Sequence, residues 1–553
     1  MDNSSYTALN KPLTPGQKNG VNICQEKLDN SWKSTTRILL GEELDDLSNY
    51  EEWLAKYTPS KGKRKSSLSG KPVTLNVDFY SKDANFISSD EIKDSAPLSI
   101  NDIKDIDSVV DAITERWQYA GNKVLGNSKF VENSDLVIDS QYVVNSTNIS
   151  NSSNVFSSFL VRSDSKHCFG SGFFGEAEFI LRTFAGYNLK RVFESYYVID
   201  SSDIYFSHHA VGCSELLFSF SQRSKRHCIG NLQLTKDKYS ELKKKLLAEV
   251  VQGLKKYKSF PSIFEMVPDK KPAQLPELKI IATESKTDMT PIEKAFASTF
   301  RVIFKKEPKK IDDFEELLSR HSIKTKSITS MFGYKTNIPD YSEFAYSLIP
   351  KSRIVSLKEA LELGKIHLNE EDITSLEKIV PKLDKIGFFT AEVFDGINNN
   401  IIDSTLLVYA TNVYKTFDAT HSEYVGIASQ ALNSKYIFGG NRVISSEFCI
   451  NCYNSTYLTR CFEVDTSTKC SDALFCHNSE GLSDALFCFN LKGKRHVIGN
   501  TILPIDQYTK IRNSLIEQIA DELLSTKTSK FDIFDIGSNN KKRSKLWHQQ
   551  LTN

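Results

Sequence analysis

Two nearly identical stretches contain the side chains that most resemble a functional site. The phrase "SKRHCIGN" covers Ser224–Asn231, and "GKRHVIGN" covers Gly493–Asn500 in the second half of the chain. The candidate contact residues are Lys225, Arg226, His227, Lys494, Arg495 and His496. One interpretation is a small cationic spot, present twice, that meets an acidic partner or a phosphate. The pattern favours a turn instead, with Lys and Arg outside, His at a strand edge and Gly-Asn leading the chain away.

Two further candidate contact residues, the histidines His208 and His477, occupy equivalent places in the two halves. His208 and His477 each follow an aspartate, Asp203 or Asp472, by five residues. An acid and a base of this kind catalyse proton transfer only when both reach the same substrate. No hydrolase elbow, zinc-protease motif, phosphate loop or dinucleotide-binding fingerprint accompanies them. We therefore predict no catalytic residue and no cofactor.

The cysteines raise the question of a metal. Six of the ten fall between Cys449 and Cys488, and a weak zinc alternative would use Cys449, Cys452, Cys461 and Cys476. A zinc ribbon takes its ligands from two close CxxC turns, and only one is present here. Cys488 follows Cys476 by 12 positions, and the first half has Ser207 and Ser219 at the equivalent places. This spacing favours stacked, nearly apolar core side chains over a metal site or a disulfide.

The two opening phrases belong to a longer duplication. At a constant offset of 269 the halves match from about Phe169/Phe438 to Tyr239/Tyr508, and further upstream the offset is 264. Within each half, apolar pairs recur at intervals of 11 to 13 positions between small polar residues. Equal short strands that stack on one another build a continuous apolar column. The pattern predicts a β-solenoid with coils of roughly 24 residues and two or so strands each, with an antiparallel β-sandwich as the alternative.

A helical pattern follows each last strand. The apolar positions after Asn231 and after Asn500 recur at helical spacing, and Thr235 is placed as an N-cap of the first helix. Because the open end of a solenoid needs a cover, we interpret these segments as capping helices. The predicted fold class is α+β: two tandem β-solenoid modules, each ended by a capping helix and preceded by a mainly helical lead-in.

The chain divides into seven parts on this interpretation. They are a polar N-terminal arm at 1–70 with one short helix near Glu42–Tyr57, a small α/β lead-in at 71–137, the first solenoid with its helix at 138–256, a linker at 257–290, a mainly helical region at 291–400, the second solenoid with its helix at 401–525, and a basic tail at 526–553.

Charge and hydropathy narrow the possible partners. With 70 basic and 69 acidic side chains, the formal net charge of +1 exerts no overall attraction on nucleic acid or anionic lipid. The basic residues of the tail, Lys541, Lys542, Arg543 and Lys545, suit a solvated segment, with nucleic-acid contact as the alternative. No signal-peptide order and no apolar run of ~18 residues is present. We expect a protein without membrane contact, located in the cytoplasm or within a viral particle.

The closing segments resemble those of a known group of proteins. "SELLFSFSQRSKRHCIGNLQLTKDKYSELKKKL" and "SDALFCFNLKGKRHVIGNTILPIDQYTKI" are similar to segments of largely uncharacterised, Cys-rich β-solenoid repeat proteins of candidate-phyla bacteria and large phages. The resemblance covers only the solenoid segments, and most of the group's rung cysteines are missing here. It implies a fold and carries no activity.

These observations together predict a non-enzymatic structural or scaffolding protein. Its partners would be other proteins or further copies of itself, in a viral particle or another large assembly. One alternative is a glycan-processing β-helix enzyme, which would line up carboxylates and aromatic rings on one face. The other alternative is a nucleic-acid-binding protein, whose binding would depend strongly on salt.

Overall fold

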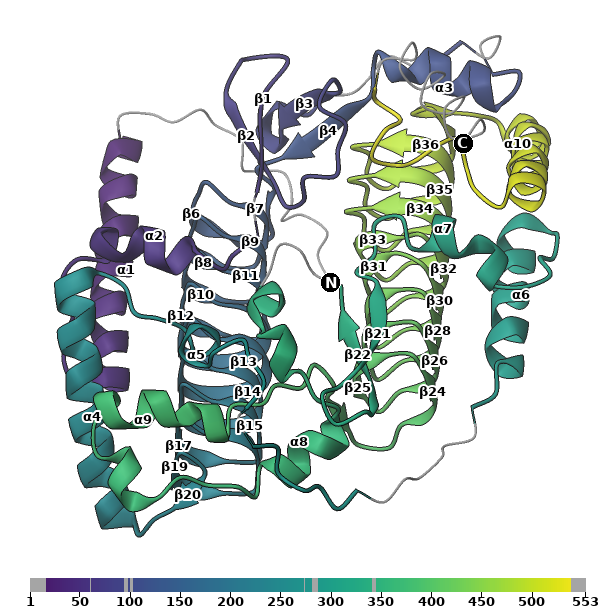
Figure 1. Cartoon of the computed structure of the whole chain (residues 1–553). Coiled ribbons are helices and arrows are strands. Elements are labelled where there is room, and N and C mark those ends of the chain that lie inside the picture. The colour runs from purple at the N-terminus through teal and green to yellow at the C-terminus, as the bar shows by residue number, and fades with distance from the viewer. Residues whose placement is uncertain are drawn as a thin grey trace, which may run out of the picture.

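Two sheets of parallel strands dominate the computed structural model of the chain (Figure 1). The structure describes residues 16–538 except 60, 94–97, 100–102, 273, 281–286 and 341–344. Each of the two sheets has sixteen strands within this described part, and we call them the first stack (β5–β20) and the second stack (β23–β38). The stacks lie side by side and run in opposite directions, so that β20 and β24 lie at the same end of the molecule (Figure 1).

The strands are short and closely spaced. Those of the first stack are β5 (Val124–Leu125), β6 (Lys129–Glu132), β7 (Asp135–Ile138), β8 (Gln141–Val144), β9 (Thr147–Ser150), β10 (Ser153–Phe156), β11 (Phe159–Arg162), β12 (Lys166–Phe169), β13 (Gly172–Leu181), β14 (Phe184–Phe193), β15 (Tyr196–Tyr205), β16 (His208–Val211), β17 (Ser214–Leu217), β18 (Phe220–Arg223), β19 (Arg226–Ile229) and β20 (Leu232–Gln233). Those of the second stack are β23 (Phe394–Asp395), β24 (Asn399–Ile402), β25 (Thr405–Val408), β26 (Thr411–Tyr414), β27 (Phe417–Thr420), β28 (Glu423–Gly426), β29 (Ser429–Leu432), β30 (Lys435–Phe438), β31 (Asn441–Ile444), β32 (Glu447–Ile450), β33 (Tyr453–Thr456), β34 (Thr459–Asp465), β35 (Ser471–His477), β36 (Ser483–Phe489), β37 (Arg495–Ile498) and β38 (Thr501–Ile502).

The pairing register fixes the length of one coil. Val143 pairs with Val155 in parallel, and Val413 pairs with Val425 in the same way. Most coils therefore take 12 residues and a few take 13. Most have two strands of four residues, while β13, β14 and β15 each run through a whole coil. The prediction of solenoid-like stacked strands is confirmed, whereas the predicted coil of twice this length is wrong. The antiparallel sandwich is also wrong, because neighbouring coils pair in parallel.

The short coil results from an unusual backbone pattern. In β7 and β8 every third residue has a positive φ, as in Leu136 (+55°), Asp139 (+47°), Tyr142 (+55°) and Asn145 (+54°). Residues other than glycine adopt this left-handed conformation rarely, at a cost of about 1–2 kcal/mol each. Four such corners close one coil. The corners include large side chains as well as Asn and Asp, so residue type alone does not reveal them.

Serine ladders run through the interior beside the apolar columns. The Ser146 amide donates to Ser134 Oγ at 3.0 Å, and the Ser158 amide donates to Ser146 Oγ at 3.0 Å. Ser146 Oγ in turn donates to the Val144 carbonyl at 2.8 Å. Each inner hydroxyl is thus bonded within its own coil and to the next one. This arrangement removes the cost of burying a polar group without a partner.

Both predicted helices form, but they lie along the stacks. α4 (Lys236–Tyr257) starts at the N-cap Thr235, whose side chain accepts from the Lys238 amide, and α10 (Ile505–Thr526) follows the second stack. Figure 1 shows α4 on the flank of the first stack beside α1 (Gly16–Leu40), and α10 on the flank of the second stack above α6 (Thr290–Phe304). The expectation that these helices cover the solenoid ends is therefore wrong.

Each stack is covered at its last coil by a segment from the other half of the chain. At the end of the first stack the Leu368 amide donates to the Gly230 carbonyl at 2.9 Å, and a Cβ at Gly230 would meet the Leu368 side chain at 2.8 Å. At the end of the second stack the Leu98 amide donates to Thr501 Oγ1 at 2.5 Å, and a Cβ at Gly499 would collide with the Leu98 side chain. The two halves therefore cover each other reciprocally.

The lead-in segments correspond to one another as well. Each has an antiparallel hairpin, β1 (Gly62–Lys65) with β2 (Pro72–Leu75) and β21 (Thr325–Thr329) with β22 (Lys335–Pro339). A serine just after β1 or β21 binds a capping-box glutamate: Ser66 binds Glu91, and Ser330 binds Glu359. The remaining elements are α2 (Glu51–Ala55), β3 (Asn85–Ser88), β4 (Gln118–Gly121), α3 (Ile106–Thr114), α5 (Ile263–Met266), α7 (Glu315–Leu318), α8 (Leu357–Leu363) and α9 (Leu376–Lys382). The region expected to be mainly helical thus also includes a hairpin.

Both terminal regions contribute to the core. The segment expected to be a polar arm contains α1, which buries Leu28 and Trp32 against the first stack. The first part of the expected basic tail packs against the second stack, where the Ile533 amide donates to Glu463 at 3.1 Å. The basic residues Lys541, Lys542, Arg543 and Lys545 lie outside the described residues. Among the helices within the described ranges, none is long and apolar enough to span a membrane.

Because each half covers the last coil of the other half's stack, a substitution in one half should loosen the last coil of the opposite stack. Leu368→Ala is expected to raise deuterium uptake in β19 and β20 of the first stack, and Leu98→Ala in β37 and β38 of the second. Removing either buried side chain costs about 2–5 kcal/mol locally. Hydrogen exchange read by mass spectrometry measures both ends in each variant, so each variant is the other's control. Increased uptake confined to the half that contains the substitution would contradict reciprocal covering.

Candidate functional site

The first basic phrase includes β19, the last parallel strand of the first stack. Lys225 and Arg226 are exposed, while His227 is half-buried with its Nε2 atom 2.5 Å from Glu215 Oε2. The chain then turns at Gly230 (φ +58°) and Asn231 (φ +63°) into the antiparallel strand β20. The predicted turn, with cations outside and a histidine at the strand edge, is confirmed.

The second basic phrase has the same geometry. Lys494 and Arg495 are exposed on β37, and Arg495 Nε lies 3.2 Å from Asp484 Oδ2. The His496 ring lies 5.3 Å from the Tyr508 ring of α10, as the His227 ring lies 5.8 Å from that of Tyr239 of α4. Each histidine therefore also joins the last coil to the helix that follows it.

Within the described part of the chain, neither aspartate pairs with the histidine five positions after it. Asp203 binds Arg191 one coil earlier, with an Nη2–Oδ2 distance of 2.7 Å. Asp472 likewise binds Arg460 at 2.6 Å. Each aspartate thus pairs with an arginine one coil away, while the histidine five positions after it is buried. These carboxylates are neutralised by Arg, so they do not form the open acidic line that a glycan-processing site would need.

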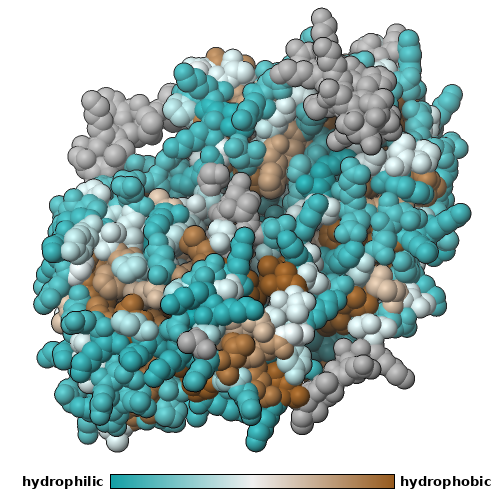
Figure 2. Space-filling view, in the orientation of Figure 1, coloured by the Kyte–Doolittle hydropathy of each residue, from teal (hydrophilic) through white to brown (hydrophobic). Residues whose placement is uncertain are grey.

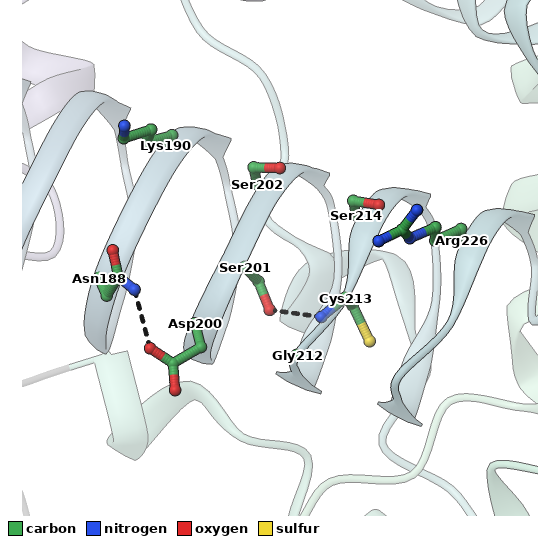
Figure 3. Close-up of a pocket in the computed structure, with 9 residues that line it drawn as sticks. All are labelled: Asn188, Lys190, Asp200, Ser201, Ser202, Gly212, Cys213, Ser214 and Arg226. Atoms are coloured by element: carbon green, nitrogen blue, oxygen red, sulfur yellow. Dashed lines mark hydrogen bonds between the residues drawn. The ribbon is translucent and has the colours of Figure 1, made fainter.

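A shallow depression on the first stack includes one of the candidate residues. It has a volume of about 280 Å³, and Figure 3 shows Lys190, Ser202, Ser214 and Arg226 in a row on β14, β15, β17 and β19. A second row runs beneath, in which Asn188 donates to Asp200 at 2.9 Å (Figure 3). Because the two serine side chains are small, the surface is lower between the side chains of Lys190 and Arg226. Such an open, polar strip suits the acidic groups of a macromolecule better than it suits an enclosed small substrate.

The equivalent strip on the second stack is only partly basic. Register pairs Thr459, Ser471, Ser483 and Arg495 in one column. Thr459 stands where the first stack has Lys190, so only the Arg end of the strip is repeated. The strip was not singled out from the sequence, although its serine pair lies within the matched segments.

His208 lies inside the molecule. His208 and its neighbour His209 are fully buried, and their ring nitrogens have no hydrogen-bond partner in the described part of the chain. The His208 ring lies 5.0 Å from that of Phe389. Burial lowers the pKa of His208 well below its usual value and that of His209 to about 3. Both rings are therefore neutral core side chains and not contact residues.

His477 belongs to a buried polar network between the halves. Its Nδ1 atom lies 2.9 Å from Asp465 Oδ2, and its Nε2 atom accepts from the Ala120 amide at 3.3 Å. Tyr80 donates to the same Asp465 carboxylate at 2.7 Å. Burial alone would raise the pKa of Asp465, but the hydrogen bonds and charge of its partners lower it. The network joins the first lead-in to the second stack, which is a structural role.

The cysteines occupy the interior ladders, as predicted from their spacing. Cys449 pairs in register with Cys461, and Cys476 pairs with Cys488. All are free and buried, and Cys476 Sγ donates to the Leu474 carbonyl at 3.5 Å, just as Ser207 Oγ donates to that of Tyr205 at 2.8 Å. Burial raises the pKa of the Cys449, Cys461 and Cys476 thiols, and it raises that of Cys470 to about 11. The described residues contain no group of three or more His, Cys, Asp or Glu placed to hold a metal ion.

Comparisons with known proteins do not assign this chain to a family. No family model, curated protein or solved structure matches it.

The buried histidines predict a pH dependence of stability. Their pKa values are lowered on folding, so below pH 6.5 the unfolded chain binds protons that the folded chain does not, and the free energy of unfolding falls with pH toward about 3. Each histidine contributes up to about 1.4 kcal/mol per pH unit in this window. His208→Phe is expected to remove the His208 contribution to this slope, while the control Phe220→Leu, which changes a buried ring without a titratable group, keeps the slope. Urea unfolding at about pH 6.5 and about 5.5 measures this. An unchanged slope in His208→Phe would show that this ring does not titrate on unfolding.

Proposed function

We propose that this chain is a non-enzymatic structural or interaction protein, built from two tandem β-solenoid modules of one duplicated unit. In this proposal it is a component of a larger assembly, such as a viral particle, and binds other proteins or further copies of itself. The observation that carries the proposal is the reciprocal cover, in which Leu98 and Leu368 close the last coil of the opposite stack.

A rigid building block needs surfaces that keep their shape when a partner binds. Both stacks supply such surfaces, because parallel coils bind each other along their whole length and the inner hydroxyls bind successive coils. An exposed sheet end would pair with other chains without specificity. The covers at Gly230 and Gly499 prevent this at the two last coils. Contacts with partners would then use the sides of the stacks.

The exposed strip that includes Lys190 and Arg226 favours a partner with acidic groups. Neither of its two cations is in an ion pair within the described part of the chain, whereas the nearby Arg191 is paired with Asp203 along the stack. A surface that is polar, open and preformed supports protein recognition more than catalysis. Nucleic-acid contact through the basic tail remains a separate prediction.

The size of the protein in its native context tests the proposal. We expect size-exclusion chromatography with light scattering, applied to gently lysed source material, to find the chain in particles well above the 62.6 kDa of one copy. Raising the salt concentration should release part of it if the basic strip contributes, because exposed ion pairs are screened by salt. Recovery only as a free monomer at low salt would contradict the proposal.

A further inference from the structure

A cleft between the two stacks combines apolar walls with buried charge. It has a volume of about 670 Å³ and lies between β13–β15 of the first stack and β25–β29 of the second. The apolar walls include Phe173, Ile199, Leu406, Val408 and Leu432. Figure 2 shows apolar side chains reaching the surface in the middle of the molecule, between the two stacks. A pocket of this size and lining is typical of a site for a small organic ligand.

Two guanidinium groups near this cleft lack a counter-ion. Arg162 lines the cleft from β11, and Arg442 lies on β31, two coils beyond Asp418 in the same column. No carboxylate in the described ranges comes within ion-pair distance of either Arg, and Arg442 Nη1 is buried without a hydrogen-bond partner. Burial lowers the pKa of both groups, and the Arg162 charge adds to this effect at Arg442.

One buried carboxylate faces these two cations. Asp418 lines the cleft with 3% of its surface exposed and accepts a hydrogen bond from Thr420 at 3.0 Å. Burial raises its pKa to about 7, although the Arg162 charge acts in the opposite direction. Among the buried groups, one carboxylate stands against two guanidinium groups, so positive charge is in excess there. Buried charges without a partner are costly, so the site favours an added anion.

The mouth of the cleft differs from its interior. Tyr187 and Tyr409 enter it from opposite stacks and are 44% and 52% exposed, and the Tyr409 ring stacks on His421 at 5.2 Å. Asp200 and Asp395 also line the cleft; Asp200 is exposed and Asp395 is half-buried. The opening therefore presents aromatic rings, while the cations lie deeper.

We propose that this cleft binds a small amphipathic anion, with an apolar or aromatic body between the two stacks and one carboxylate or sulfonate group paired with Arg162. The body would replace water along the apolar walls, and the head group would supply the missing counter-charge. Arg suits this role because its planar guanidinium binds an anionic group through two parallel hydrogen bonds.

Two fluorescent probes that differ only in charge test this proposal on the full chain. 8-Anilinonaphthalene-1-sulfonate has the anionic group, and N-phenyl-1-naphthylamine is the same body without it. We expect the sulfonate to bind at least about tenfold more tightly than the neutral probe, since a charge-assisted hydrogen bond is involved. Arg162→Gln should abolish this difference, and Arg162→Lys should retain part of it. The matched control Arg191→Gln, on the outer face, should leave it unchanged.

A second variant keeps the test decisive if Arg162→Gln does not fold. Tyr409→Ala alters an exposed ring at the mouth, and it should weaken both probes without changing the preference for the sulfonate. Equal binding of the two probes to the unmodified chain would overturn the proposal. A preference for the sulfonate that survives in folded Arg162→Gln would overturn it as well.

Discussion

The parallel register between successive coils is the constraint on which the rest of the structure depends. Because each inner coil binds the coil before it and the coil after it, most residues of a stack have neighbours 12 positions away on both sides. An inward position must therefore suit a column, which explains why serine follows serine and cysteine follows cysteine. Outward positions follow the same rule, as the Arg191–Asp203 and Arg460–Asp472 pairs show.

A stack built in this way has no natural end. Its last coil leaves backbone groups and apolar side chains without a neighbour, and such an edge promotes aggregation. Here the chain resolves the problem with its duplication. The glycine of each Ile-Gly-Asn turn has no side chain, which allows a leucine from the other half to lie against the coil. Neither half can close its own last coil by this contact, so the two copies depend on each other.

Several features were predictable from the sequence because they are periodic or local. The recurrence of apolar pairs predicted stacked strands, the equal spacing of Cys476 and Cys488 predicted a ladder, and the Gly-Asn pair predicted the exit from the last coil. The coil length was not predictable, because it depends on left-handed corners that Leu136 and Tyr142 occupy against their usual preference. The helix α1 was missed since its polar face dominates the composition of that segment, and only the stack reveals which side is buried.

The sites between the halves were beyond sequence reasoning for a different reason. Arg162 and Asp418 are far apart in the chain and face one another only after both stacks have formed. The same holds for His477, which accepts from the Ala120 amide and shares the Asp465 carboxylate with Tyr80, while the aspartate five residues before it binds an arginine. Ala120 and Tyr80 belong to the other half. Short-range motifs such as an acid near a base are misleading in a fold where true neighbours are one coil apart.

Calorimetry of the intact chain tests the mutual dependence of the two halves most directly. If each half closes the other, neither stack is stable alone, and we predict one unfolding transition whose calorimetric enthalpy equals its van't Hoff enthalpy. Two separate transitions, each accounting for part of the total enthalpy, would show that the halves unfold independently and would contradict this account.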